Sequence, residues 1–159
     1  MKLKKVVLVW ALALLGGLAW VTLAQAQSPD DLGKAIAANY LDALKKVNEL
    51  MKARLEAADL SPKVEALKEE TIKKMVEVGQ KVAKLNEADK KKVDTKMSMA
   101  FGNTPQDLFK AFSEGQQFYA KKDATLGKTI KDFNIITQYA LFDLLKKQEP
   151  KEAERLGIK

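Results

Sequence analysis

The sequence predicts an all-α protein. After residue 27, apolar residues recur at steps of three and four, the spacing that gathers side chains on one face of a helix. No stretch shows the strict alternation of a half-buried strand, and the helix-favouring residues Ala, Leu, Lys and Glu are abundant. We expect an up-and-down helical bundle of four long segments plus one short helix, preceded by an N-terminal signal or anchor helix.

Residues 1–26 have the layout of a secretory signal. Three lysines precede an apolar run over residues 6–24, and the small residues Ala24 and Ala26 flank Gln25, as a signal peptidase requires. We therefore predict that residues 1–26 are a signal peptide and that the chain is cut after Ala26.

A retained membrane anchor is the alternative. The apolar run of about 19 residues approaches the roughly 20 needed to span a bilayer, although Gly16 and Gly17 weaken a helix at that point. In either case the basic start stays in the cytoplasm and places the chain from Gln27 onward outside it. We expect an exported protein, periplasmic or extracellular, that touches a membrane only through a retained N-terminal helix.

Cysteine and histidine are both absent from the 159 residues. Their absence excludes disulfides, histidine-dependent serine and cysteine nucleophiles, zinc sites of thiolate or imidazole, haem attachment through cysteine, and iron–sulfur clusters. We expect no cofactor and no metal, and we predict that the protein is not an enzyme. The formal charge of +7 falls to +4 without the three leader lysines, a mild excess that suits an anionic envelope surface but not nucleic acid.

Three hydroxyl–proline pairs mark expected helix starts, at Ser28-Pro29, Ser61-Pro62 and Thr104-Pro105. The hydroxyl caps free backbone amides, proline fits the first helical turn, and nearby carboxylates oppose the positive end of the helix. Asn86 is expected to cap a fourth helix in the same way.

Five helical segments follow from these starts and from the apolar spacing. They are expected over residues 29–58, 62–85, 87–101, 105–120 and 125–148. The last is apolar on nearly every side from Phe133 onward, so it should lie at the centre of the bundle or carry a partner interface on one flank. Residues 27–149 then form the helical domain, and residues 150–159 form a short C-terminal tail.

Two candidate chemical sites have simpler structural explanations. Glu114 is a lone acid such as a glycosidase uses, but the helical wheel turns it away from the apolar face, so it should stay hydrated. Met97 and Met99 could offer thioethers to Cu(I), but residues two apart on a helix point in directions about 200° apart. We expect Met97 to fill the core and Met99 to make a neighbouring contact.

Two surfaces remain as candidate binding sites. The first is an anion-docking patch, where a lysine triplet carries few nearby acids: Lys90, Lys91, Lys92 and Lys96. The second is an apolar pocket or interface in the aromatic-rich C-terminal half: Phe109, Phe112, Phe133, Tyr139 and Phe142. The ordinary alternatives are a solvated helix face for the lysines and plain core packing for the rings.

The sequence therefore favours a non-enzymatic exported protein that acts by protein–protein contact in the cell envelope, as an accessory subunit of a membrane complex if the leader is retained. The partner is another protein or a second copy of the chain, with an anionic envelope surface or lipid as a further candidate. The alternative is a carrier that encloses a lipid or other apolar ligand between its aromatic-rich C-terminal helices.

Overall fold

Helices make up nearly all of the chain that the computed structural model describes, residues 27–159, and no strand lies within that range. The all-α prediction is confirmed there, whereas the predicted leader lies outside the described residues. The elements in chain order are α1 (Pro29–Lys52), α2 (Ala57–Val82), α3 (Glu87–Gly102), α4 (Gln106–Lys122), α5 (Ala124–Lys131), the 3-10 helix η1 (Asp132–Ala140), α6 (Phe142–Gln148) and α7 (Pro150–Arg155).

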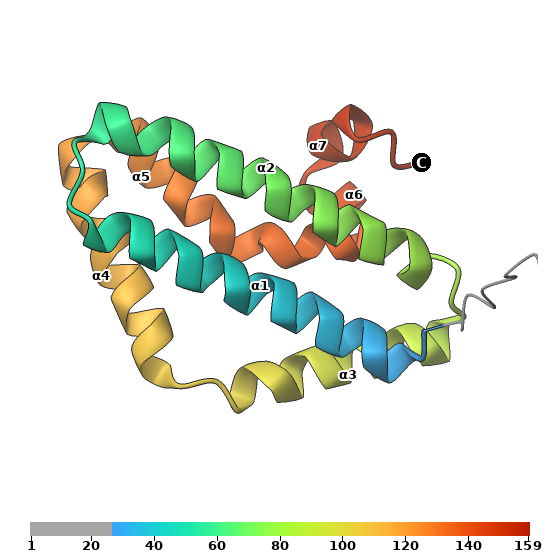
Figure 1. Cartoon of the computed structure of the whole chain (residues 1–159). Helices are drawn as coiled ribbons and strands as arrows, with labels where there is room; N and C mark the ends of the chain where they lie inside the picture. The colour runs from blue at the N-terminus through green and yellow to red at the C-terminus, as the bar shows by residue number, and fades with distance from the viewer. Residues whose placement is uncertain (1–26) are drawn as a thin grey trace, which may run out of the picture.

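Helix α1 holds the central place in the fold (Figure 1). It packs against α2, α3, α4 and η1, so four neighbours cover its apolar stripe. Residues of that stripe are at most 1% exposed: Leu32, Ile36, Ala43, Leu44 and Val47. The prediction of a central last segment is only half right, because η1 is buried against α1 and α2 but α1 is the helix that the others surround.

Two helices begin where their caps predict. The Ser28 hydroxyl accepts a hydrogen bond from the backbone N–H of Asp31 at 3.2 Å, and α1 starts at the next residue. The Asn86 side chain accepts one from the N–H of Asp89 at 2.9 Å, and α3 starts at Glu87. These bonds satisfy amides that a helix leaves free at its N-terminus.

The predicted boundary between the first two helices is wrong. Helix α1 ends at Lys52 and α2 begins at Ala57, so Pro62 lies inside α2 and starts no helix. The chain turns at Arg54, whose φ of +52° is left-handed. That conformation ends many helices but usually belongs to glycine, so an arginine there gives no stop signal in the sequence.

The Thr104 cap is also wrong. Its hydroxyl donates to the carbonyl of Ala100 at 3.0 Å and so satisfies the end of α3. Pro105 occupies the cap position of α4 with no side-chain bond. The helix nevertheless runs from Gln106 to Lys122, close to its predicted range.

The predicted last helix is broken into three pieces, α5, η1 and α6. In a 3-10 helix, residues three apart lie on one face. Phe133, Ile136 and Tyr139 have this spacing in η1, and each is at most 4% exposed. The tighter winding thus aligns three large side chains toward α1 and α2, and Leu141, with φ −119° and ψ 75°, ends it.

Glycine allows close approach at two helix contacts. A Cβ on Gly33 of α1 would lie 2.6 Å from the Val93 carbonyl oxygen of α3, so the two helices touch through backbone. A Cβ on Gly79 of α2 would collide with the ring of Phe142. Gly33 therefore allows the close approach of α1 to α3, and Gly79 leaves room for the Phe142 ring against α2.

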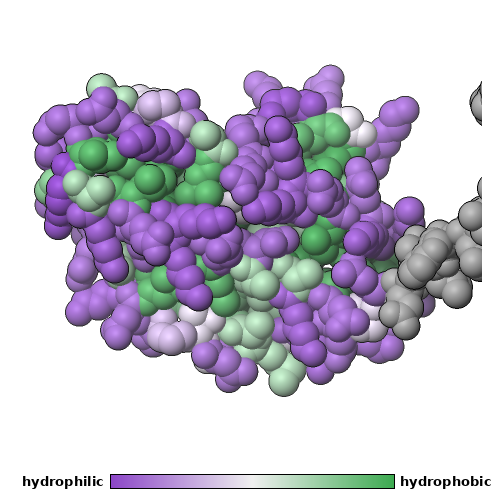
Figure 2. Space-filling model, viewed as in Figure 1, coloured by the Kyte–Doolittle hydropathy of each residue, from purple (hydrophilic) through white to green (hydrophobic). Residues whose placement is uncertain are grey.

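Polar side chains cover most of the visible face, and the apolar areas between them are separate from one another (Figure 2). In the described part of the chain, Met99 is the one large apolar side chain that is mostly exposed, at 56%. None of the helices within residues 27–159 combines the length and the apolar character needed to cross a bilayer.

Candidate functional site

A cleft of about 540 Å³ opens where the end of α2, the first turns of α3 and the start of α6 meet. We call it the α3–α6 cleft. The residues that define it are Val82, Lys90, Lys91, Asp94, Phe142 and Lys146. Apolar side chains come from α2 and α6, and charged side chains come from α3 and α6, so the cleft has both apolar and charged walls.

Lys90 connects α3 to α6 across the cleft. Its Nζ lies 2.9 Å from Oε1 of Glu87 and 3.0 Å from Oδ2 of Asp143. The hydrogen bonds that Lys90 donates to Glu87 and Asp143 raise the pKa of Lys90. On the other side, hydrogen bonds from Lys90 and then from Lys146 lower the pKa of Asp143. Lys90 and Asp143 are therefore both charged near neutral pH, and Lys90 is held in place by its partners.

Two charged side chains on the α3 wall of the cleft are free of such pairs. Lys91 and Asp94 lie one turn apart on α3 and line the cleft, yet neither forms an ion pair with any residue in the described range 27–159. Partial burial raises the pKa of Asp94, which accords with a carboxylate that lacks a cationic partner. These two side chains can pair with an incoming molecule at no cost to the fold.

The lysine patch predicted from the sequence is more neutralised than its composition indicates. Lys92 pairs with Asp89 at 2.7 Å, and Lys96 pairs with Asp30 of α1 at 2.8 Å. With Lys90 also paired, Lys91 alone of the four has no carboxylate partner among the described residues. Anion docking stays a prediction for this surface, and Lys90 and Lys91 are the members that reach the cleft.

The predicted apolar residues do not gather around one cavity. Phe112, Phe133 and Tyr139 belong to the core, with exposed fractions of 5%, 0% and 4%. Phe109 is partly buried against that core, and Phe142 lines the α3–α6 cleft. The structure thus brings one predicted apolar residue together with two predicted lysines. The ion pair between Lys90 and Asp143 that joins their helices spans 53 positions, which spacing along the chain could not indicate.

The two candidate chemical sites lie as follows. Glu114 is exposed on α4, as its place on the helical wheel predicts. Met97 packs partly buried against the core, while Met99 on the same helix faces solvent. Within residues 27–159 no three His, Cys, Asp or Glu side chains are grouped to hold a metal ion.

No protein-family model, no curated protein and no solved structure matches this chain.

Proposed function

We propose that the chain is a non-enzymatic, exported helical protein that acts by binding another protein in the cell envelope through the α3–α6 cleft. The observation that carries this proposal is the combination of an apolar wall with free charges of both signs. Protein interfaces have this arrangement, in which an apolar centre supplies binding energy and a polar rim supplies orientation.

The free charges define the partner's chemistry. Lys91 can form an ion pair with a carboxylate of the partner, and Asp94 can form one with a lysine or arginine. Phe142 and Val82 offer apolar contact. An amphipathic segment with one acidic and one basic residue beside an apolar residue satisfies all three. Since the cleft is mixed in sign, a purely anionic surface such as a lipid headgroup layer fits it less well.

Carriage of a lipid between the C-terminal helices has less support. Three of the five rings proposed to line such a cavity are core residues, and rings that pack against neighbours leave no room for a ligand. Export itself rests on the leader sequence, and a retained leader would make the protein an accessory subunit of a membrane complex.

Site-specific photo-crosslinking in the cell that makes the protein tests the proposal. A photoreactive residue replaces Lys146 at the cleft, and a control replaces Lys63, which is exposed on α2 and does not line the cleft. We expect one discrete protein adduct from position 146 and none from position 63. Exchanging the two free charges of α3 (Lys91→Glu with Asp94→Lys) should remove that adduct, because each position then repels the partner's charge. Both positions are exposed, so the exchange keeps the fold.

Two results would contradict the proposal. One is an equal adduct pattern from the two positions. The other is native mass spectrometry that shows co-purified lipid together with no protein adduct at the cleft, which would favour the carrier.

A further inference from the structure

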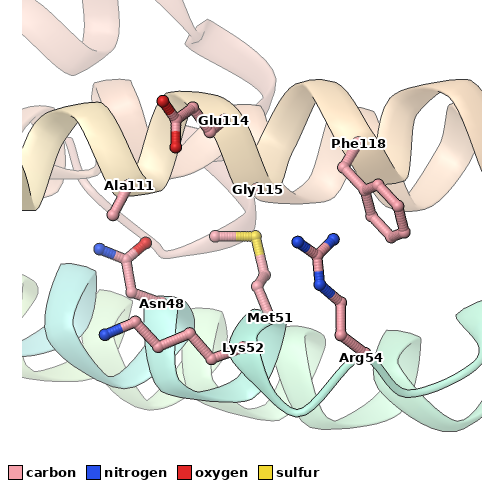
Figure 3. Close-up of a pocket in the computed structure, with 8 residues that line it drawn as sticks. All are labelled: Asn48, Met51, Lys52, Arg54, Ala111, Glu114, Gly115 and Phe118. Atoms are coloured by element: carbon pink, nitrogen blue, oxygen red, sulfur yellow. The ribbon is translucent and has the colours of Figure 1, made fainter.

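A second pocket, of about 440 Å³, lies between the C-terminal end of α1 and helix α4 (Figure 3). We call it the α1–α4 pocket. Asn48, Met51 and Arg54 line it on the α1 side, and Glu114, Gly115 and Phe118 line it on the α4 side. It shares no residue with the α3–α6 cleft, so an inference about it stands apart from the proposed function.

Arg54 is held in an unfavourable backbone conformation. Its φ of +52° is left-handed, where a side chain is disfavoured and glycine is the usual residue. Its guanidinium carbon lies 4.3 Å from the centroid of the Phe118 ring, which positions the charge at the pocket. Neither Arg54 nor the adjoining Lys52 forms an ion pair with a residue in the described chain. An arginine kept in this conformation, with its charge free, points to a binding role.

Asn48 supplies a buried polar atom that lacks a partner. The residue is 5% exposed, and its Nδ2 donates to the carbonyl of Leu108 at 3.0 Å. That bond fixes the orientation of the amide, because turning it over would set its oxygen against another oxygen. Its Oδ1 has no hydrogen-bond donor. In Figure 3 the amide projects from α1 toward α4, into the space between them. A buried acceptor without a donor is unfavourable, so a ligand that brings an N–H or O–H gains by reaching it.

Glu114 gives the pocket a negative charge, opposite in sign to Lys52 and Arg54. It lies on α4, across the pocket from Lys52 and Arg54 of the α1 side (Figure 3). Among residues 27–159 its carboxylate has no cationic partner within ion-pair distance. The pocket therefore carries a free anion on one wall and free cations on the other, with the Met51 and Phe118 side chains beside them.

We propose that the α1–α4 pocket binds a small zwitterion of the amino-acid type, a free amino acid or a short peptide with free ends. Its carboxylate pairs with Arg54, with Lys52 beside it. Its ammonium group donates to Glu114 and to the Oδ1 of Asn48. Its side chain contacts Met51 and Phe118. A simple anion would leave Glu114 and the Asn48 oxygen unpaired, and a simple amine would leave Arg54 unpaired.

Calorimetric titration of the full chain with two probes, L-leucine and L-alanyl-L-leucine, tests the proposal. We expect saturable binding of at least one of them. Blocking the amino end by acetylation, or the carboxyl end as the amide, should each weaken binding about tenfold or more, because each removes a charged hydrogen bond. No saturable binding of either probe, or equal affinity of the blocked forms, would overturn the proposal.

Two variants test whether the ligand binds in this pocket. Arg54→Gly removes the guanidinium at a position whose φ suits glycine, so the fold is kept and binding should weaken about tenfold or more. Glu114→Gln should weaken the binding of the zwitterion while leaving the affinity for the acetylated form unchanged. Glu49→Gln, exposed on α1 outside the pocket, is the matched control and should bind as the wild type does. Wild-type affinity in Arg54→Gly would show that the ligand binds elsewhere.

Discussion

Replacing Gly33 with alanine should destabilise the protein by separating α1 from α3. The added Cβ would lie 2.6 Å from the carbonyl oxygen of Val93 and 2.8 Å from the Cβ of Lys96, where ordinary contact begins at 3.4 Å. Neither neighbour is the far end of a flexible side chain. The clash is relieved only if the backbone of α3 moves, and α3 carries Lys91 of the α3–α6 cleft.

The expected change in the free energy of unfolding is the difference between two opposing effects. Overpacking of this kind costs about 1–3 kcal/mol. Alanine in place of glycine inside a helix regains up to about 1 kcal/mol. Because the obstructing atoms belong to the backbone and to a Cβ, the cost should exceed the gain. We expect a net loss of about 1–2 kcal/mol in the free energy of unfolding, which lowers Tm by roughly 3–8 °C in a domain of this size.

Gly102 provides the matched control for this substitution. It is the last residue of α3, and a Cβ there would meet nothing within 4 Å. Gly102→Ala should therefore leave the free energy of unfolding unchanged or raise it by up to about 1 kcal/mol. Urea unfolding followed by far-ultraviolet circular dichroism measures both variants. A Gly33→Ala protein as stable as the wild type would refute the backbone contact between α1 and α3.

Three further outcomes are expected. Burial, and then the charge of Glu152, raise the pKa of Tyr139, so its contribution to stability is complete below about pH 10 and declines as the pH rises further. Ultraviolet titration should show tyrosinate forming at higher pH in native than in urea-unfolded protein, and Tyr139→Phe should reduce that difference in pH. Lys68 and Asp132 form a half-buried pair at 2.6 Å, and a double-mutant cycle with Lys68→Met and Asp132→Asn should give a coupling energy of about 1 kcal/mol. Both tryptophans lie in the predicted leader, so protein purified from its own cell should show no indole emission if the leader is cut, and clear emission would mean that it is retained.

The sequence predicted the start of a helix correctly where a side chain caps the end of its own helix. Ser28 and Asn86 act within three residues of themselves, so their capping bonds depend on little else. Thr104 has the same local pattern but bonds backward to Ala100, because α3 extends to Gly102 and its open carbonyls compete for the hydroxyl. A cap is predictable only when one helix end lies within reach.

The breaks between helices depended on contacts that spacing does not show. Arg54 adopts a glycine-like conformation while its side chain lies on Phe118 of a distant helix. The 3-10 winding of η1 follows from packing against α1 and α2, although the spacing of Phe133, Ile136 and Tyr139 is visible afterwards as its signal.

The candidate sites were predictable as residues but not as groupings. The predicted lysine patch lies on α3, yet Asp143, which pairs with Lys90, comes from α6, and Asp30, which pairs with Lys96, comes from α1. Asn48 gave no signal at all, since a polar residue inside an apolar stripe has meaning only once its buried surroundings are known.

The central position of α1 makes the first helix of the described range 27–159 among the last to be fully covered. Its apolar stripe contacts η1, which begins only at Asp132, so a growing chain presents that stripe to its surroundings until most of the polypeptide has been made. An incomplete chain that ends before η1 would therefore be a target for holdase chaperones and proteases.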